Sequence, residues 1–134
     1  EPHLSLAMAE QRLAALNVKH LPVRAAGRVV GILSDRDILL AKTLPGVDTN
    51  KVDVAHAMSE APYSTSANTP LAEVAEAMVE NQYGAALIVD EKQHLVGIFT
   101  TTDALKVLAD LEFTRSGTGQ QSKATTFIGL KQKN

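Results

Sequence analysis

The chain has 134 residues, of which 45% are hydrophobic and 4% aromatic, and it contains no Trp and no Cys. This length suits one compact domain or two small fused repeats, and the lack of Cys excludes disulfide bonds and thiolate metal sites. The net charge of −2 gives no general attraction to nucleic acid or anionic membranes, and no apolar run approaches the roughly 20 residues that span a bilayer, so we expect a cytoplasmic protein without a membrane segment in this chain.

The N-terminal third of the chain predicts a group of elements that ends before a connection containing Pro45. Apolar residues at Leu6, Ala9 and Leu13 recur with the spacing of one helical face. Two apolar runs separated by a turn at Gly27 follow as a hairpin, and a second short helix comes next. The group is therefore a helix, a strand, a turn, a strand and a helix, over residues 6–17, 18–23, 25–28, 29–33 and 37–42.

A second group of elements repeats this order. The helical face returns in register as Leu71, Val74 and Met78, 65 positions further along the chain. Thr69 and Pro70 mark its start, as a capping hydroxyl followed by proline at the first helical position. The matching strand, turn, strand and helix are predicted over residues 83–89, 90–93, 95–99 and 103–111. Such an internal repeat decides the architecture, because each copy forms one structural unit.

The second group also has a lead-in that the first group lacks. A short helical turn around Val54, Ala57 and Met58 is followed by an extended stretch over residues 62–65. Only five residues precede Leu6, so we expect the first repeat to lack this strand.

The same sequence motif stands at the end of the second strand of each repeat: a glycine, two apolar residues, a hydroxyl residue, two variable residues and an aspartate. The copies run from Gly31 to Asp37 and from Gly97 to Asp103. A spacing of three places the hydroxyl residue and the aspartate on the same side of the first helical turn. Two related sites at matched positions indicate binding rather than catalysis. The same spacing is also typical of a capping box, in which the acid accepts from the cap N–H, and this alternative stays open.

In the order and duplication of its motifs, the chain resembles a tandem pair of CBS domains, the nucleotide-sensing unit called a Bateman module. The phrases that carry the resemblance are residues 20–23, 30–37, 58–59 with Pro62, and 96–103, and the repeat extends it over about residues 2–111. The resemblance implies an α/β (α+β) fold of two repeats related by a pseudo-twofold axis, each a small sheet flanked by two helices, with repeat 1 lacking its N-terminal strand.

We place the boundaries of the repeats in the connections between the predicted elements. Repeat 1 covers residues 1–45, repeat 2 covers residues 46–112, and residues 113–134 form a flexible C-terminal tail or an expression-vector remnant. Within this tail, residues 125–128 could pair as a short strand.

The resemblance also implies a function. CBS pairs have two clefts between the repeats that take adenosine-containing ligands such as AMP, ADP, ATP or S-adenosylmethionine, and they commonly form homodimers. We therefore expect a regulatory module in which ligand occupancy biases the orientation of the repeats and a partner domain or subunit reads the change. The alternative is a dimerisation scaffold without a ligand, which the missing strand of repeat 1 favours slightly.

The residue types at the two predicted sites suit a nucleotide. A carboxylate accepts hydrogen bonds from both ribose hydroxyls, the role expected for Asp37 and Asp103. The helix start beside Ser34 or Thr100 offers N–H donors and a favourable dipole to a phosphate. Arg36 either contacts phosphate, which suits guanidinium geometry, or is a solvated charge. By the resemblance, the purine slot is lined at the Asp103 site by Tyr63, Ser64, Ala85 and Leu87, and at the Asp37 site by His20 and Pro22.

Other functional classes find less support in the sequence. The repeat would place its two aspartates in separate clefts, where they could not act as an acid–base pair, and no Ser-His-Asp arrangement is present. The four His residues are dispersed, without the i, i+4 helical spacing that suits a metal. No basic stripe or aromatic platform indicates nucleic acid binding. We therefore expect neither an enzyme nor a metalloprotein.

Overall fold

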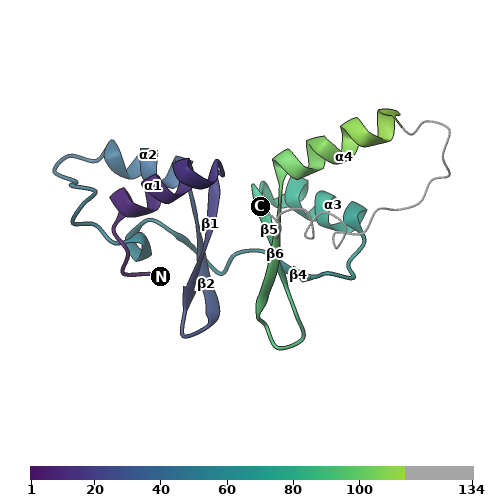
Figure 1. Ribbon diagram of the computed structural model, residues 1–134, viewed down its shortest axis with the longest axis horizontal. Coiled ribbons are helices and arrows are strands. Elements are labelled where there is room, and N and C mark those ends of the chain that lie inside the picture. The colour runs from purple at the N-terminus through teal and green to yellow at the C-terminus, as the bar shows by residue number, and fades with distance from the viewer. Residues whose placement is uncertain (114–134) are drawn as a thin grey trace. The chain divides into compact units, whose positions relative to one another are not determined.

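The computed structural model describes residues 1–113, which form two compact units. Unit 1 comprises Glu1–Pro62, and unit 2 begins at Tyr63. The described residues contain four α-helices and two three-stranded sheets, one sheet in each unit (Figure 1). None of these helices combines the length and the apolar character that crossing a bilayer requires.

Unit 1 packs two helices on a sheet with strand order β1-β2-β3, in which both strand pairs are antiparallel. Its core joins one face of α1 to the hairpin and to the start of the connection, through Leu6, Ala9, Leu13, Val23, Leu33, Ile38 and Val54. The elements are α1 (Leu6–Leu16), β1 (His20–Ala25), β2 (Arg28–Ser34), α2 (Asp35–Lys42), a 3₁₀ turn η1 (Val54–His56) and β3 (Ser59–Glu60).

Unit 2 has a sheet of order β4-β5-β6, in which β4 runs parallel to the central strand and β6 runs antiparallel to it. Its core again joins one face of the first helix to the hairpin, through Leu71, Val74, Met78, Ala86, Ile88 and Phe99. The elements are β4 (Ser64–Ser66), α3 (Leu71–Asn81), β5 (Ala85–Val89), β6 (Leu95–Thr100) and α4 (Thr101–Phe113).

The internal repeat extends to details of the backbone. In unit 1 the register shifts between Val23 and Arg24, which leaves Val30 without a paired residue, and unit 2 repeats this bulge between Ile88 and Val89. The first helix of each unit also ends in the same way, with a non-glycine residue in the left-handed region: Asn17 has a φ of 51° and Gln82 has a φ of 58°. A bulge bends its strand, and a left-handed residue at a helix end sets the direction in which the chain leaves the helix. Both units therefore share the same backbone arrangement.

The two sheets differ in their third strand. In unit 2, β4 pairs with β5, whereas within residues 1–113 no strand pairs with the corresponding outer edge of β1. Unit 1 instead gains β3 on the far side of the hairpin, where Glu60 pairs with Gly31. This arrangement fits the expectation that repeat 1 lacks its lead-in strand. The connection 46–62 packs with unit 1, so the repeat boundary at residue 45 stays a prediction about the sequence units.

Several predicted details need correction. Thr69 does not cap α3: the N-cap is Pro70, which has no side-chain cap, and the Thr69 hydroxyl lies 2.7 Å from the Thr65 hydroxyl instead. Helices α2 and α4 both begin two residues earlier than predicted, because they start directly after Ser34 and Thr100. Helix α4 continues to Phe113, the first residue of the predicted tail. The predictions for residues 114–134, including the short strand at 125–128, lie outside the described residues.

Candidate functional site

The repeated hydroxyl–carboxylate motif of unit 2 lies where β6 ends and α4 begins. Both the backbone N–H and the hydroxyl of Thr100 donate to Asp103 Oδ2, at 2.8 and 3.0 Å. Thr100 is 7% exposed and Asp103 is 4% exposed. A carboxylate this deeply buried needs hydrogen-bond donors, and the strand end supplies them. The carboxylate is therefore held in a fixed position at the start of the helix.

The motif of unit 1 forms a reciprocal capping box. The N–H of Asp37 donates to Ser34 Oγ at 3.1 Å, and the N–H of Ser34 donates to Asp37 Oδ2 at 2.8 Å. Both residues are half-buried. The hydroxyl accepts from the helix in unit 1, whereas in unit 2 it donates to the carboxylate. The capping alternative considered from the sequence is therefore present at this site, and it fixes the position of the carboxylate there too.

The strand pairing brings further predicted residues beside each motif. In unit 1, His20 pairs with Ser34, and in unit 2, Ala85 pairs with Thr100. Pro22, two positions along β1, lies on the same face of the sheet as His20, because side chains alternate along a strand. His20, Ser34 and Asp37 thus form one group in unit 1, with Pro22 next to it.

Leu87, Tyr63 and Ser64 meet at the parallel pair of β4 and β5. Ser64 pairs with Leu87, whose N–H donates to the carbonyl oxygen of Tyr63 at 2.8 Å. Leu87 is fully buried, whereas Ser64 is exposed. Alternation places Leu87 on the same face of β5 as Ala85 and opposite to the face that packs on the helices. Ser64, Ala85 and Leu87 therefore share one face of the sheet of unit 2, whereas Tyr63 packs against the core on the face that the helices cover.

Tyr83 belongs beside this group, although we did not predict it from the sequence. Its ring stacks on that of Tyr63, with the centroids 5.3 Å apart and the planes 14° from parallel. Tyr83 therefore covers one face of the Tyr63 ring, and Tyr63 also packs against the core cluster, so its role in a purine slot with Ala85 and Leu87 stays a prediction. The only indication of this stack in the sequence was that the chain has just two Tyr residues.

Arg36, the predicted phosphate contact, is the second residue of α2 and is exposed. Its backbone N–H donates to Asp35 Oδ1 at 2.8 Å. Within residues 1–113 its guanidinium makes no ion pair or hydrogen bond. Arg36 is therefore an exposed cation in the first turn of α2, between the two residues of the Ser34–Asp37 capping box.

A shifted pKa is found at one carboxylate outside these motifs. The pKa of Asp90, in the turn between β5 and β6, is lowered, chiefly because the backbone N–H of His94 donates to it, with a further hydrogen bond from the N–H of Lys92. This arrangement orders the turn. No group of three His, Cys, Asp or Glu residues suited to a metal ion occurs in the described part of the chain.

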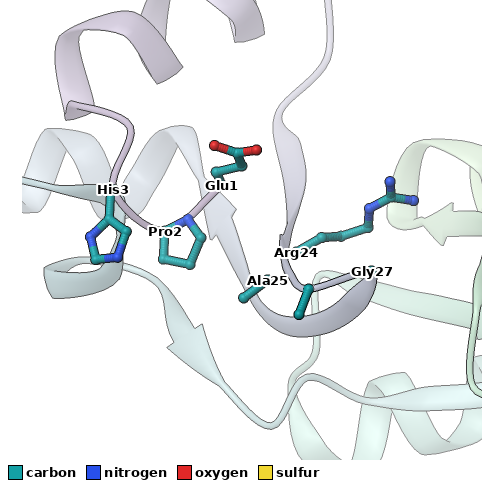
Figure 2. Close-up of a pocket in the computed structure, with 7 residues that line it drawn as sticks. Glu1, Pro2, His3, Arg24, Ala25 and Gly27 are labelled. Atoms are coloured by element: carbon teal, nitrogen blue, oxygen red, sulfur yellow. The ribbon is translucent and has the colours of Figure 1, made fainter.

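An open hollow in unit 1 lies apart from the predicted residues. It is lined by residues 1–3 and by residues 24–27 at the tip of the β1–β2 hairpin (Figure 2). Figure 2 shows the side chain of Arg24 extending away from Pro2 and His3, so the polar groups do not converge. A ligand site needs convergent polar groups, and this hollow offers none to a nucleotide.

The duplicated frame and its motifs match a known family. The sequence model of the CBS domain matches residues 1–43 and 53–110. The chain belongs to the CBS domain family. A CBS domain-containing protein of Dictyostelium discoideum is 30% identical to it over 114 residues, which cover 78% of this chain and 79% of the relative. The predicted fold class, an α/β pair of CBS repeats with a small sheet in each, is confirmed.

Two crystal structures of CBS proteins are similar to this chain and contain adenosine ligands. One is a CBS domain pair in complex with 5′-methylthioadenosine and S-adenosyl-L-methionine, with a TM-score of 0.74 and 25% identity, covering 82% of this chain and 86% of the other. The second is CBSX2 in complex with AMP, with a TM-score of 0.69 and 25% identity, covering 83% of this chain and 86% of the other. CBS proteins similar to this chain therefore bind adenosine compounds.

Proposed function

We propose that this CBS pair is a regulatory module that binds an adenosine-containing ligand and transmits its occupancy to a partner domain or subunit. The observation that carries the proposal is the buried Asp103 carboxylate, positioned by two donors from Thr100. In unit 1 the half-buried Asp37 carboxylate is held at the matched position by one donor, the N–H of Ser34. The complexes of similar CBS proteins with AMP and with S-adenosyl-L-methionine support the ligand class. The role is non-catalytic.

The positioned carboxylates are suited to a ribose. A ribose presents two neighbouring hydroxyls, and one carboxylate accepts hydrogen bonds from both. Because Thr100 and Ser34 hold the two carboxylates in place without a ligand, little ordering remains to be done on binding, which favours affinity. A ligand regulates only if it binds two conformations with different affinity, so a ligand seated at these carboxylates must favour one arrangement of the module.

The proposal is tested by calorimetric titration with AMP, ADP, ATP and S-adenosylmethionine. We expect saturable binding of at least one ligand, and we expect Asp103→Ala or Asp37→Ala to abolish it at one site. Glu76→Ala is the matched control, because Glu76 is an exposed acid on α3 outside both motifs. Thermal melting of each variant separates loss of binding from loss of the fold. Binding that survives both aspartate substitutions contradicts the proposal.

A ligand-free dimerisation scaffold is the second candidate, and a specific observation favours an interface. Helix α4 exposes Leu105 and Leu108, at 66% and 58%, and α2 exposes Leu39 and Leu40, at 65% each. Adjacent exposed leucines on a helix are typical of a surface that another protein covers. We therefore propose a homodimer in either case. Sedimentation analysis of Leu105→Lys tests it: a shift from dimer to monomer supports the interface, and a monomeric wild type contradicts it.

Ligand binding distinguishes the regulatory module from the ligand-free scaffold. A folded, dimeric sample that binds none of the four ligands supports the scaffold, whereas binding with or without dimerisation supports the ligand module. A cytoplasmic location stays a prediction from the sequence.

A further inference from the structure

Strand β3 is held on the sheet of unit 1 by little of its own surface. It consists of Ser59 and Glu60, and both side chains are exposed. The two residues pair with Ile32 and Gly31 at the edge of the sheet. Because so short an edge strand buries almost no apolar surface, a neighbouring residue must supply the apolar contact that keeps it in place.

Met58, the residue directly before β3, supplies this contact. A Cβ at residue 31 would lie 2.5 Å from Met58 Sδ and 3.0 Å from Met58 Cγ, so the thioether occupies the space that a side chain at Gly31 would fill. Gly31 pairs with the buried Val23, and the side chains of directly paired residues share one face of a sheet. The Met58 side chain therefore completes the core face of the sheet, where it packs against the core of unit 1.

The chain beyond β3 opposes the pairing. Ala61 has a φ of 49°, in the left-handed region that a residue with a Cβ rarely adopts. Pro62 follows it, and a residue before proline favours an extended backbone. Detachment of β3 would allow Ala61 to return to the extended region. The strain at Ala61 thus favours release of β3, whereas the apolar contact of Met58 opposes release.

We propose that Met58 is an oxidation-sensitive switch, which holds β3 on the sheet as a thioether and releases it as a sulfoxide. The oxidant is a peroxide. A lone pair of Met58 Sδ attacks one oxygen of hydrogen peroxide, the S–O bond forms as the O–O bond breaks, and the departing hydroxide takes the proton of the transferred oxygen and becomes water. The sulfur loses two electrons, which reduce the peroxide. Met58 is half-buried, so a small oxidant reaches it more readily than Met78, which is 5% exposed.

The sulfoxide does not fit the place of the thioether. Its oxygen is a polar acceptor, and burying a polar group without a donor costs free energy. The cluster that Met58 packs against consists of hydrophobic residues, whose side chains offer no donor. The oxidised side chain should therefore move into solvent, and β3 should leave β2. Residues 58–62 lead directly into unit 2, which begins at Tyr63, so release lengthens the untethered connection between the units.

The test uses the full chain, treated with hydrogen peroxide and analysed by mass spectrometry. Peptide mapping locates the gain of an oxygen atom, and hydrogen exchange is followed in β3 and, for comparison, in β1. Met58→Leu retains the apolar bulk but forms no sulfoxide. Met58→Gln carries a polar oxygen without any oxidant. Met8→Leu is the matched control, because Met8 is 50% exposed on α1, outside the contact with Gly31.

We expect peroxide to oxidise Met8 first, Met58 next and Met78 last. Exchange in β3 should then become about tenfold faster, while exchange in β1 changes by less than about twofold. Met58→Gln should show fast exchange without oxidant, Met58→Leu should show no response to peroxide, and Met8→Leu should respond as the wild type does. Treatment with methionine sulfoxide reductase and a dithiol should restore slow exchange.

The switch is wrong if Met58 is oxidised no faster than Met78, because a peroxide then does not reach the thioether in the folded protein. It is also wrong if the sulfoxide leaves exchange in β3 unchanged, or if Met58→Leu responds to peroxide as the wild type does. Equal acceleration in β3 and β1 would show that oxidation unfolds unit 1 as a whole, which contradicts release of β3 alone. None of these measurements involves a ligand, so the proposed function stands or fails separately.

Discussion

Replacing Gly31 with alanine should destabilise unit 1 by crowding β3. A Cβ at residue 31 would lie 2.5 Å from Met58 Sδ and 2.9 Å from the backbone oxygen of Ser59. The Met58 side chain can move, but the Ser59 oxygen belongs to the strand that pairs with β2 beside Gly31. The substitution must therefore displace β3 or force β2 away from it.

The magnitude follows from the two contacts. Overpacking in a closely packed region costs about 1–3 kcal/mol, and here one of the two atoms in contact is backbone and cannot rotate away. We expect the free energy of unfolding to fall by about 2 kcal/mol, together with faster exchange of the Glu60 amide hydrogen. Urea denaturation gives the first quantity, and hydrogen exchange gives the second.

A double-mutant cycle identifies the cause. Met58→Ala removes the sulfur contact, so Gly31→Ala should cost less in that background than in the wild type, with the remainder due to the Ser59 oxygen. The reasoning is refuted if the free energy of unfolding of Gly31→Ala lies within about 0.5 kcal/mol of the wild-type value, roughly the additivity error for uncoupled sites. In that case the close approach of β3 to Gly31 does not restrict this position.

Three further predictions concern single hydrogen bonds and turns. Thr100→Val keeps the shape but removes the hydroxyl that donates to the buried Asp103, so we expect a loss of about 2 kcal/mol in urea denaturation; an unchanged midpoint would contradict this role. Ala26 and Gly27 both have positive φ, 50° and 79°, so Ala26→Asn should raise the stability of unit 1 by about 0.5–1 kcal/mol, measured in the same way; no gain would show that alanine is unstrained there. The lowered pKa of Asp90 means that its contribution to stability is present above its unfolded pKa of about 3.9 and is lost as pH falls through the lower folded value. Asp90→Asn should therefore flatten the dependence of stability on pH below that point, and an unchanged slope would argue against it.

The sequence predicts the repeated frame well, because apolar spacing and the duplicated motif are local signals. Leu6, Ala9 and Leu13 are buried as their spacing indicates, and so are Leu71, Val74 and Met78. Element boundaries were less accurate where a proline or a hydroxyl residue had two possible roles. Pro70 serves as the N-cap rather than as the first helical residue, and only the backbone angles distinguish these roles.

The candidate sites were predictable in part. The pairing of His20 with Ser34 and of Ala85 with Thr100 follows from the repeat, once the two strands form a hairpin. The stack of Tyr83 on Tyr63 was not predictable, because it joins the segment just before β5 to the segment just before β4, and these are far apart in the sequence. Nor could the sequence indicate that Thr100 would donate to its aspartate while Ser34 would accept.

The third strands of the two sheets have a consequence for the order of folding. The hairpins β1–β2 and β5–β6 join neighbouring segments, so they can form within microseconds. Strands β3 and β4 pair with residues distant along the chain, Gly31 and Leu87 among them, and must close long loops first. Both strands are also short and lie at the edges of their sheets. The segment that contains them should therefore join the sheets last during folding and detach first under native conditions, while both hairpins stay closed.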